Sequence, residues 1–224
     1  MNVYPIFLNN LSDRRCVIFG GNSEAERKAK GLLECKADVE IVSPAGTDEL
    51  ARLSSQGEIK WIRREYEPGD VRGAFLVIVS ETNPPRTRPI FEEAERENVL
   101  INAMDDIQHC TFVAGSVVRR GLLTVAVSTS GAAPTLAVRL REEFEERFGP
   151  EYETFLDWMM ALRDPMARHY ADFELRRSIW YRLVDSDILS LLSAGRSSEA
   201  RALVESVIGS DVAAEAFDAV PDQA

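Results

Sequence analysis

Short apolar runs alternate with polar stretches whose apolar residues recur three and four positions apart, and this pair repeats through the first half of the chain. Residues 16–19 form the first run, which stops at Gly20-Gly21 and is followed by a helical face of Ala25, Ala29, Leu32 and Leu33. Further runs cover residues 39–42, 75–79 and 99–101, and Ile90, Phe91 and Ala94 mark a second helical face after a chain break at Pro84-Pro85. Continuous apolar runs are typical of parallel strands buried on both faces, and helices between them imply right-handed crossovers. The pattern therefore predicts an α/β domain with a parallel sheet over residues 1–112.

The pattern changes after Thr111. Residues 113–118 and 122–127 predict two strands joined by a tight turn at Arg119-Arg120-Gly121. A helix is predicted from Pro134, because proline is tolerated in a first turn and Leu136, Ala137, Leu140 and Phe144 then share one face. Two strands and a helix bury too little apolar surface to be stable alone. We therefore interpret residues 113–147 as a small α+β dimerisation segment that a twin subunit completes.

The remainder of the chain carries no strand pattern and predicts a helical domain over residues 148–218. Phe155, Trp158 and Leu162 share one helical face, and Leu189, Leu191 and Leu192 belong to a later helix. Ser197-Ser198 offers an N-cap to a helix that ends near Gly209. Residues 219–224 are expected to be a frayed tail.

Composition and charge narrow the class of protein. The 224 residues carry a formal net charge of −11, which argues against nucleic-acid binding and means that an anionic substrate needs a local basic patch. No apolar stretch approaches the roughly 18 residues that span a membrane, and residues 1–15 lack the regions of a signal peptide. The three cysteines have neither disulfide nor zinc spacing, and Cys16 is simplest as a small buried hydrophobe. We expect a cytoplasmic protein with no membrane or nucleic-acid partner and no metal-ligand cluster.

The glycine turn after the first strand carries the most specific chemistry. A strand, a glycine turn and a helix start together form the phosphate-binding beginning of a dinucleotide fold, so the domain is predicted to be Rossmann-like. Aligned from Gly20 with the fingerprint G-x-G-x-x-A, the turn matches except at its second glycine, and its candidate cofactor-binding residues are Gly20, Gly21, Asn22, Ser23, Glu24 and Ala25. Asn22 stands where glycine normally lets the backbone approach the pyrophosphate. Asparagine tolerates left-handed dihedrals, so we expect the turn to survive while the side chain occupies space meant for phosphate.

Two carboxylates follow the last predicted strand of the sheet. Asp105 and Asp106 stand at the edge where ligands gather in open α/β sheets, and a neighbouring carboxylate can raise one pKa into the range of a general base. Acids after a strand also form loops or cap helices, and position alone favours that structural role. His109-Cys110 suits a metal or a proton shuttle, but such a pair more often simply begins the next element. His169, in the helical part, is a weaker candidate.

Hydroxyls and guanidinium groups cluster after residue 118. Ser128, Thr129 and Ser130 precede the helix at Pro134, where hydroxyls and free N–H groups hold an anion or merely cap the helix. Capping is the simpler interpretation of the pattern. Arg119-Arg120 suits either a solvated turn or a polycarboxylate ligand.

Taken in order, three segments resemble one family. YPIFLNN with RRCVIFGG-x-x-x-AERK, then NAMDD, and then RRG-LLTVAVSTSG-x-x-P-x-LA-x-x-LREE are similar to the precorrin-2 dehydrogenase/sirohydrochlorin ferrochelatase family, the siroheme-synthase module. The resemblance covers residues 3–165 and implies a homodimer that uses NAD to oxidise precorrin-2, a tetrapyrrole polycarboxylate, to sirohydrochlorin. Some members then insert ferrous iron, and a single aspartate serves both steps. The family motif N-x-x-D falls on Asn102 to Asp105, so Asp105 inherits the role of general base.

The resemblance also assigns binding residues. NAD is expected on the glycine turn, on Ser43 and Pro44 near the adenosine ribose, and on Thr82 and Asn83 near the nicotinamide. The tetrapyrrole is expected near Ser128 and Thr129, with Arg119, Arg120 and Arg139 as counter-charges. No resident metal is implied.

Two departures from the family keep alternatives open. Asn22 replaces a glycine, and Glu81-Thr82-Asn83 replaces an A-T-D-D-like turn. Ser43 also stands where an acidic residue usually reads the ribose, so NAD and NADP are not distinguished. The alternatives are a chelatase with impaired NAD binding and a non-catalytic tetrapyrrole-binding protein. The effect of Asn22 on NAD binding and the role of Asp105 as general base are the features that distinguish these alternatives.

Overall fold

The chain forms two compact units, Met1–Ala114 and Gly115–Ala224. The structure, a computed structural model, describes residues 3–104 and 106–217. Position 105 and residues 219–224, on which the predicted general base and frayed tail fall, lie outside the described residues. No helix of the described residues is long and apolar enough to cross a membrane.

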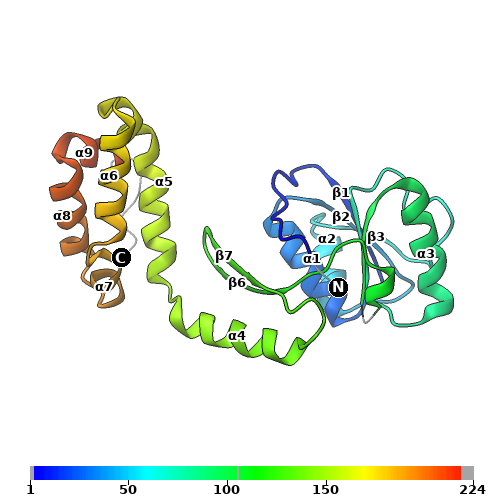
Figure 1. Ribbon diagram of the computed structural model, residues 1–224. Helices are drawn as coiled ribbons and strands as arrows, with labels where there is room; N and C mark the ends of the chain where they lie inside the picture. The colour runs from blue at the N-terminus through cyan, green and yellow to red at the C-terminus, as the bar shows by residue number, and fades with distance from the viewer. Residues whose placement is uncertain (1–2, 105, 218–224) are drawn as a thin grey trace. The chain divides into compact units, whose positions relative to one another are not determined.

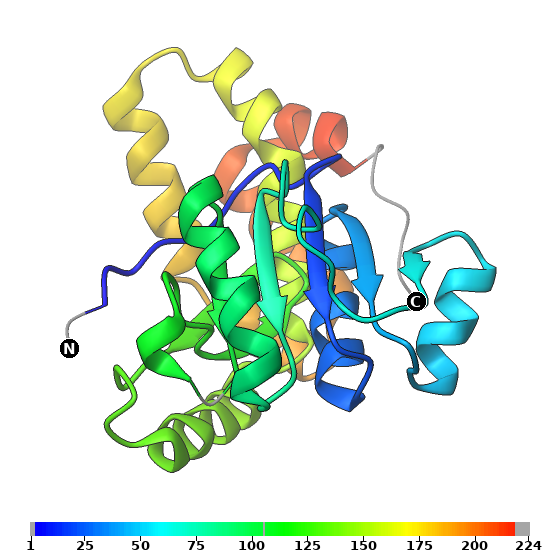
Figure 2. The same ribbon diagram turned by 90° about the vertical axis from the view of Figure 1, so that its right-hand side faces the viewer.

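The first unit is a five-stranded parallel sheet in the order β3-β2-β1-β4-β5 (Figure 2). Its strands are β1 (Arg15–Phe19), β2 (Asp38–Val42), β3 (Lys60–Ile62), β4 (Leu76–Val79) and β5 (Leu100–Ala103). Its helices are α1 (Ser23–Glu34), α2 (Asp48–Ser55), α3 (Pro84–Glu97) and the 3₁₀ turn η1 (Ile107–His109). The predicted parallel Rossmann-like sheet is confirmed.

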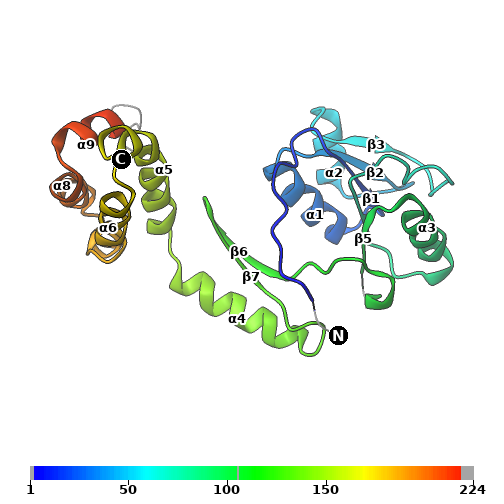
Figure 3. The same cartoon turned by 45° about the horizontal axis from the view of Figure 1, so that its top comes forward.

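Both faces of the sheet are covered, which explains the continuous apolar runs. Side chains of β1 alternate between two cores: Cys16 and Ile18 pack with α1 and α2, whereas Val17 and Phe19 pack with α3. Figure 3 shows α1 and α3 on opposite sides of the strands. Cys16 is fully buried, as predicted, and burial raises the pKa of its thiol to about 11.

Three local features differ from the sequence prediction. Helix α2 and the edge strand β3 carry no clear pattern and are found only in the structure. Pro84-Pro85 does not break the chain but forms the first turn of α3, where the missing N–H groups of proline cost nothing.

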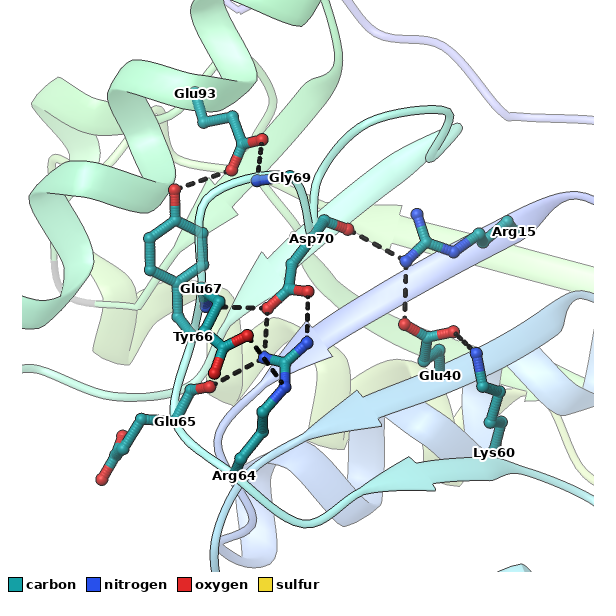
Figure 4. Close-up of polar contacts among 10 residues, drawn as sticks. All are labelled: Arg15, Glu40, Lys60, Arg64, Glu65, Tyr66, Glu67, Gly69, Asp70 and Glu93. Carbon is teal, nitrogen blue, oxygen red and sulfur yellow. Dashed lines mark hydrogen bonds and ion pairs between the residues drawn. The ribbon is translucent and has the colours of Figure 1, made fainter.

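A network of charges fastens the connection between β3 and β4 to the sheet (Figure 4). Arg64 makes two 2.7 Å hydrogen bonds to the Asp70 carboxylate. The Tyr66 hydroxyl donates to buried Glu93 at 2.7 Å, and burial together with this carboxylate raises the tyrosine pKa. Arg15 donates to the Asp70 carbonyl at 2.9 Å. These bonds fix a connection that has almost no secondary structure of its own.

The second unit combines a hairpin with helices. Its elements are β6 (Ser116–Arg120), β7 (Leu123–Val127), α4 (Pro134–Arg147), α5 (Glu151–His169), α6 (Phe173–Val184), α7 (Ile188–Ser193), α8 (Ser197–Ile208) and α9 (Ser210–Phe217). Helices α5–α9 pack as one group (Figure 1), around a core that includes Trp158, Leu162, Leu183 and Ile208. The predicted α+β segment followed by helices is present.

Two boundaries in this unit correct the prediction. Arg119 and Arg120 do not form the hairpin turn, because they belong to β6 and pair with Thr124 and Leu123. The turn consists of the two residues between the strands, Gly121 and Leu122. Ser197 is the first helical residue of α8 and Arg196 holds the N-cap position without a side-chain cap, so the serines do not cap this helix.

The hairpin and α4 bury little. Among described residues of 115–147, Val118 and Ala137 are the buried hydrophobic side chains, whereas Leu122, Leu136 and Val138 are exposed. This agrees with the expectation that the segment has too small a core of its own.

Buried Glu40 provides a test of this framework. Its carboxylate accepts from Arg15 and Lys60, each at 2.8 Å. Burial by itself raises the Glu40 pKa most, but the two cations together outweigh it and hold the pKa below its usual 4.5. Since the folded-state pKa is depressed, this stabilisation is complete above the unfolded value and disappears as pH falls through the folded one.

We predict that Glu40→Gln lowers the free energy of unfolding by about 2 kcal/mol at neutral pH, because two cations lose a buried partner. Urea denaturation at several pH values should show that the difference in free energy of unfolding between the variant and wild type shrinks below about pH 4.5. Glu58→Gln, which removes the same charge at an exposed site, is the control and should have little effect. A gap independent of pH contradicts the assignment.

Candidate functional site at the carboxyl edge of the sheet

A cleft of about 450 Å³ lies at the carboxyl ends of three neighbouring strands. Its walls come from the turn after β1, the loop after β2 and the first residues after β4. The lining residues are Gly21, Asn22, Ser43, Pro44, Ala45, Gly46, Thr47 and Glu81.

This is the place where an open α/β sheet is expected to bind a ligand. From β1 the chain progresses outward to β2 and β3 on one side, and β4 and β5 then lie on the other. The order therefore reverses between β1 and β4, and ligands bind outside the carboxyl ends at such a switch point. The glycine turn and Glu81 flank it.

The floor of the cleft is the backbone of Gly21 packed against the backbone of the loop after β2. Gly20, which precedes it, is not among the lining residues but is also closely packed. Gly20 has φ +112°, and a Cβ there would lie 2.2 Å from the Ser80 hydroxyl oxygen. A Cβ on Gly21 would lie 2.0 Å from the Ala45 carbonyl oxygen. The Thr47 N–H donates to the Gly21 carbonyl at 3.1 Å and holds the two loops together. Both glycines are therefore required by close contact.

Asn22 does not adopt the left-handed conformation that the sequence suggested. Its φ of −78° and ψ of 179° are extended, and it is the N-cap of α1. Its Oδ1 accepts from the Ala25 N–H at 2.9 Å, and its Nδ2 donates to the Ser80 carbonyl at 2.8 Å. The Asn22 side chain therefore accepts a hydrogen bond from one of the N–H groups that a helix start would otherwise offer to an anion.

The other residues predicted on this turn have varied positions. Ala25 is fully buried and allows α1 to pack closely on the sheet. Glu24 pairs along the helix with Arg27 and Lys28, and the hydrogen bond from Arg27 lowers its pKa most. Ser23 is the first helical residue, and neither it nor Glu24 lines the cleft.

The loop after β2 contributes more than the sequence indicated. Ser43 and Pro44 were predicted, whereas Ala45, Gly46 and Thr47 were not. The Ser43 hydroxyl donates to the Ala45 carbonyl at 2.6 Å, and Thr47 caps α2 while donating to Glu26 at 2.8 Å. The turn composition of S-P-A-G-T, directly after a strand, was the signal that could have marked the whole loop.

The connection after β4 places a different residue in the cleft from those predicted. Glu81 lines the cleft, whereas Thr82 and Asn83 lead into α3 and are not among its lining residues. The Glu81 carboxylate lies 3.7 Å from Arg86, which also pairs with Glu65 at 3.1 Å.

The end of β5 is held at the same edge of the sheet. The Met104 N–H donates to the Val79 carbonyl at 2.9 Å. The Asp106 carboxylate lies 2.6 Å from His109 Nδ1, and the His109 ring packs edge-on against Phe91. The Cys110 sulfur bonds to the backbone of Ala103, and burial raises its pKa.

These contacts give His109 and Cys110 local structural roles. Within residues 3–104 and 106–217 no group of three or more His, Cys, Asp or Glu side chains could hold a metal ion. His169 lies in the second unit and pairs with Glu215 at 3.0 Å.

The remaining predicted residues belong to the second unit. Ser128 accepts from the Ser130 N–H and Thr129 from the Ala133 N–H, both at 3.2 Å, so these hydroxyls organise the turn before α4. Arg120 donates to the Phe148 carbonyl at 2.8 Å and fastens β6 to the end of α4. Arg119 is exposed in β6, and Arg139 is exposed and pairs with Glu142 at 3.2 Å.

A larger, mainly apolar groove of about 730 Å³ also lies in the second unit. It runs along α5 and α6 beside the hairpin turn. Leu122, Met160 and Val184 line it and are each more than half exposed.

Comparison with known proteins gives three consecutive family matches. A family described as putative NAD(P)-binding matches residues 7–116, a sirohaem biosynthesis protein central region matches 120–147, and a sirohaem synthase dimerisation region matches 151–208. The dimerisation description therefore falls on the helices, whereas the sequence placed a dimerisation segment at 113–147.

Curated relatives and one solved structure agree with these matches. Siroheme synthase 1 of Pectobacterium atrosepticum is 34% identical over 200 residues, which are 89% of this chain and 42% of that protein. Siroheme synthase 1 of Aeromonas salmonicida is 31% identical over 216 residues, 96% of this chain and 46% of that protein. The chain thus spans less than half the length of these relatives.

A solved structure described as SirC, precorrin-2 dehydrogenase, has the same fold. It superposes with a TM-score of 0.74 at 20% identity, over 91% of this chain and 100% of that one.

Gly21→Ala tests the backbone floor of the cleft. The new Cβ meets backbone atoms 2.0 Å and 2.8 Å away, so the loop after β2 must shift. We expect the free energy of unfolding to fall by about 1–3 kcal/mol in urea titrations. Gly31→Ala on α1, where a Cβ meets nothing within 4 Å, should instead stabilise by about 0.5–1 kcal/mol. Equal stability of the two variants contradicts the proposed close approach.

Proposed function

Because the chain belongs to the siroheme synthase family, we propose that it oxidises precorrin-2 to sirohydrochlorin with NAD. The observation that carries this proposal is the cleft at the switch point of the sheet, whose floor tolerates no side chain at Gly21. A floor of bare backbone beside a helix start suits a pyrophosphate.

The glycine turn, the loop after β2 and the segment after β4 would bind different parts of the dinucleotide. Gly20, Gly21 and the start of α1 would hold the pyrophosphate, and Ser43 and Pro44 would border the adenosine ribose. Thr82 and Asn83, after β4, would face the nicotinamide half. Bound NAD would supply the hydride acceptor.

Asp105 would act as the general base that removes a proton from precorrin-2 during this oxidation. Its neighbour Met104 is bonded to Val79 at the carboxyl edge, on the nicotinamide side of the switch point. Asp106 is the weaker candidate, because its carboxylate already pairs with His109.

The second unit would complete the enzyme through a twin subunit. The apolar groove beside Leu122, Met160 and Val184 and the small core of residues 115–147 both favour a homodimer. Its location in the cytoplasm stays a prediction from the sequence. We retain residues 113–147 as the interlocking segment and 148–218 as the helical domain. Ser128, Thr129, Arg119, Arg120 and Arg139 are proposed to face the tetrapyrrole carboxylates, with the guanidinium groups as local counter-charges on an acidic protein.

A second candidate is a chelatase that inserts ferrous iron into sirohydrochlorin with Asp105 but binds NAD weakly. Two observations favour it. Asn22 occupies the Ala25 N–H that an anion would use, and the Glu81 carboxylate lines the same cleft. Both oppose a pyrophosphate.

Incubation of the purified full chain with precorrin-2 and NAD separates these candidates. We expect sirohydrochlorin to form only when NAD is present, and its absorbance measures this reaction. A separate assay measures the insertion of ferrous iron into sirohydrochlorin. Iron insertion without NAD-dependent oxidation supports the chelatase. Tetrapyrrole binding with neither activity identifies a binding protein and refutes the proposed enzyme.

Asp105→Asn should lower kcat for the oxidation by at least about a hundredfold, because it removes the base while keeping the shape. Asp106→Asn is the matched control and should retain most activity. Gel filtration should show the same oligomer for both variants. If Asp106→Asn is the inactive variant, the base has been assigned to the wrong carboxylate.

Asn22 is predicted to weaken NAD binding in wild type. Asn22→Gly frees the Ala25 N–H and should tighten NAD binding by about threefold to tenfold, measured by calorimetry. Asn22→Asp keeps a capping oxygen but adds a negative charge beside the pyrophosphate, and should weaken it by a similar factor. Unchanged affinity in both variants would mean that the side chain does not compete with the phosphate.

A further inference from the structure

The segment that follows β5 carries the proposed general base at position 105, and its backbone is bonded on both sides of that position. The Met104 N–H donates to the Val79 carbonyl of β4 at 2.9 Å, and the Asp106 N–H donates to the Ala103 carbonyl at 3.4 Å. The second bond is longer than the usual range for an N–H donor and is therefore weak. A further contact closes this turn, and it comes from a side chain.

The Cys110 thiol makes this contact. Its sulfur accepts from the Ala103 N–H at 3.1 Å and lies 3.2 Å from both the Ala103 and the Asp106 carbonyl oxygens. A thiol has one proton, so it donates to one of these carbonyls at a time while it accepts from the N–H. The sulfur thus joins the backbone before position 105 to the backbone after it.

Cys110 is in turn held against the sheet by the residues that follow it. The Thr111 N–H donates to the Ile101 carbonyl at 2.8 Å, and the Ile101 N–H donates to the Thr111 hydroxyl at 2.8 Å. The Asn102 side-chain amide donates to the Phe112 carbonyl at 3.1 Å. The segment that contains Cys110 therefore runs beside β5, and the sulfur is anchored to the edge strand of the sheet.

The environment of Cys110 suits a thiol that forms hydrogen bonds rather than one that reacts. The side chain is half-buried and packs against the core that contains Ile90 and Ala94 of α3. Burial raises its pKa, so the thiol stays protonated at neutral pH and keeps the proton that it donates. A protonated thiol is a poor nucleophile, so these contacts favour a positioning role over a covalent one.

The geometry of this turn matters because proton removal depends on position. A general base must lie within hydrogen-bond reach of the proton that it removes. A displacement of about 1 Å in a reacting group can lower a rate about a hundredfold. The contacts that fix the backbone around position 105 therefore bear on the rate of the oxidation.

We propose that Cys110 is a positioning residue, whose thiol closes the turn after β5 and thereby aligns the Asp105 carboxylate with precorrin-2. The inference rests on the proposed function, because it takes Asp105 to be the general base. It adds to that function a second residue that acts through the base and does not touch the substrate.

Cys110→Ala tests the inference in the full chain, because it removes the hydrogen bonds of the sulfur and introduces no new polar group. With precorrin-2 and NAD, kcat should fall at least about tenfold, whereas KM for precorrin-2 and Kd for NAD should change less than about threefold. The stoichiometry of NAD binding in calorimetry counts the folded molecules, so kcat refers to these alone. Gel filtration checks that the oligomer is retained.

Cys110→Ser separates hydrogen bonding from packing. Serine keeps a donor and an acceptor at this position, so kcat should lie within about fivefold of wild type and above that of Cys110→Ala. If packing were responsible, the order would be reversed, because a hydroxyl is less favourable than a methyl group against an apolar core. Cys35→Ala makes the same change at the C-cap of α1, outside this turn, and should keep the wild-type kcat.

A wild-type kcat in Cys110→Ala overturns the inference and leaves the proposed function intact, as does a serine variant no faster than the alanine variant. If the wild-type chain inserts ferrous iron but does not oxidise precorrin-2, the proposed oxidation fails. The order of the same variants in iron insertion then supports or overturns the inference, because Asp105 is the proposed base there too. If the wild-type chain has neither activity, the proposed function and the inference fail together.

Discussion

Burial of both faces of one parallel sheet is the constraint on which the first unit depends. Because Val17 and Phe19 enter one core and Cys16 and Ile18 the other, β1 presents no face to solvent. Polar chemistry is thereby confined to the segments that leave the carboxyl edge. The glycine turn, the loop after β2 and Glu81 all lie there, so the position of the cleft follows from the sheet itself.

The same constraint explains how much of the fold the sequence predicts. Central strands β1, β2, β4 and β5 are apolar on both faces and stand out as continuous runs. Strand β3 does not, because its three residues lie at the sheet edge and none is buried. Helix α2 buries only Leu50 and Leu53, which is too few to mark a helical face. In the second unit, the sequence places the hairpin turn at Arg119-Arg120-Gly121, because charged residues next to a glycine are typical of turns. In the structure both arginines are strand residues.

At the site, local motifs were predictable and non-local contacts were not. The glycine turn is identified by its spacing, but the conformation of Asn22 depends on Ser80, which is 58 residues away. Capping of α1 fixed that conformation, where the sequence had suggested a left-handed turn. Likewise, Gly46 and Thr47 line the cleft because their loop closes on Gly21, a contact that no pattern within the loop records.

The contact between the Gly21 and Ala45 backbones also bears on the thermodynamics of binding. Backbone packed on backbone has no rotamers to lose, so the conformational entropy of the floor is lost during folding and not when a ligand arrives. The floor is therefore a preorganised receptor. The amide of Asn22 lies beside this rigid surface and makes two hydrogen bonds, which it must give up if a phosphate takes its place. The enthalpy of that exchange should appear in the heat of binding.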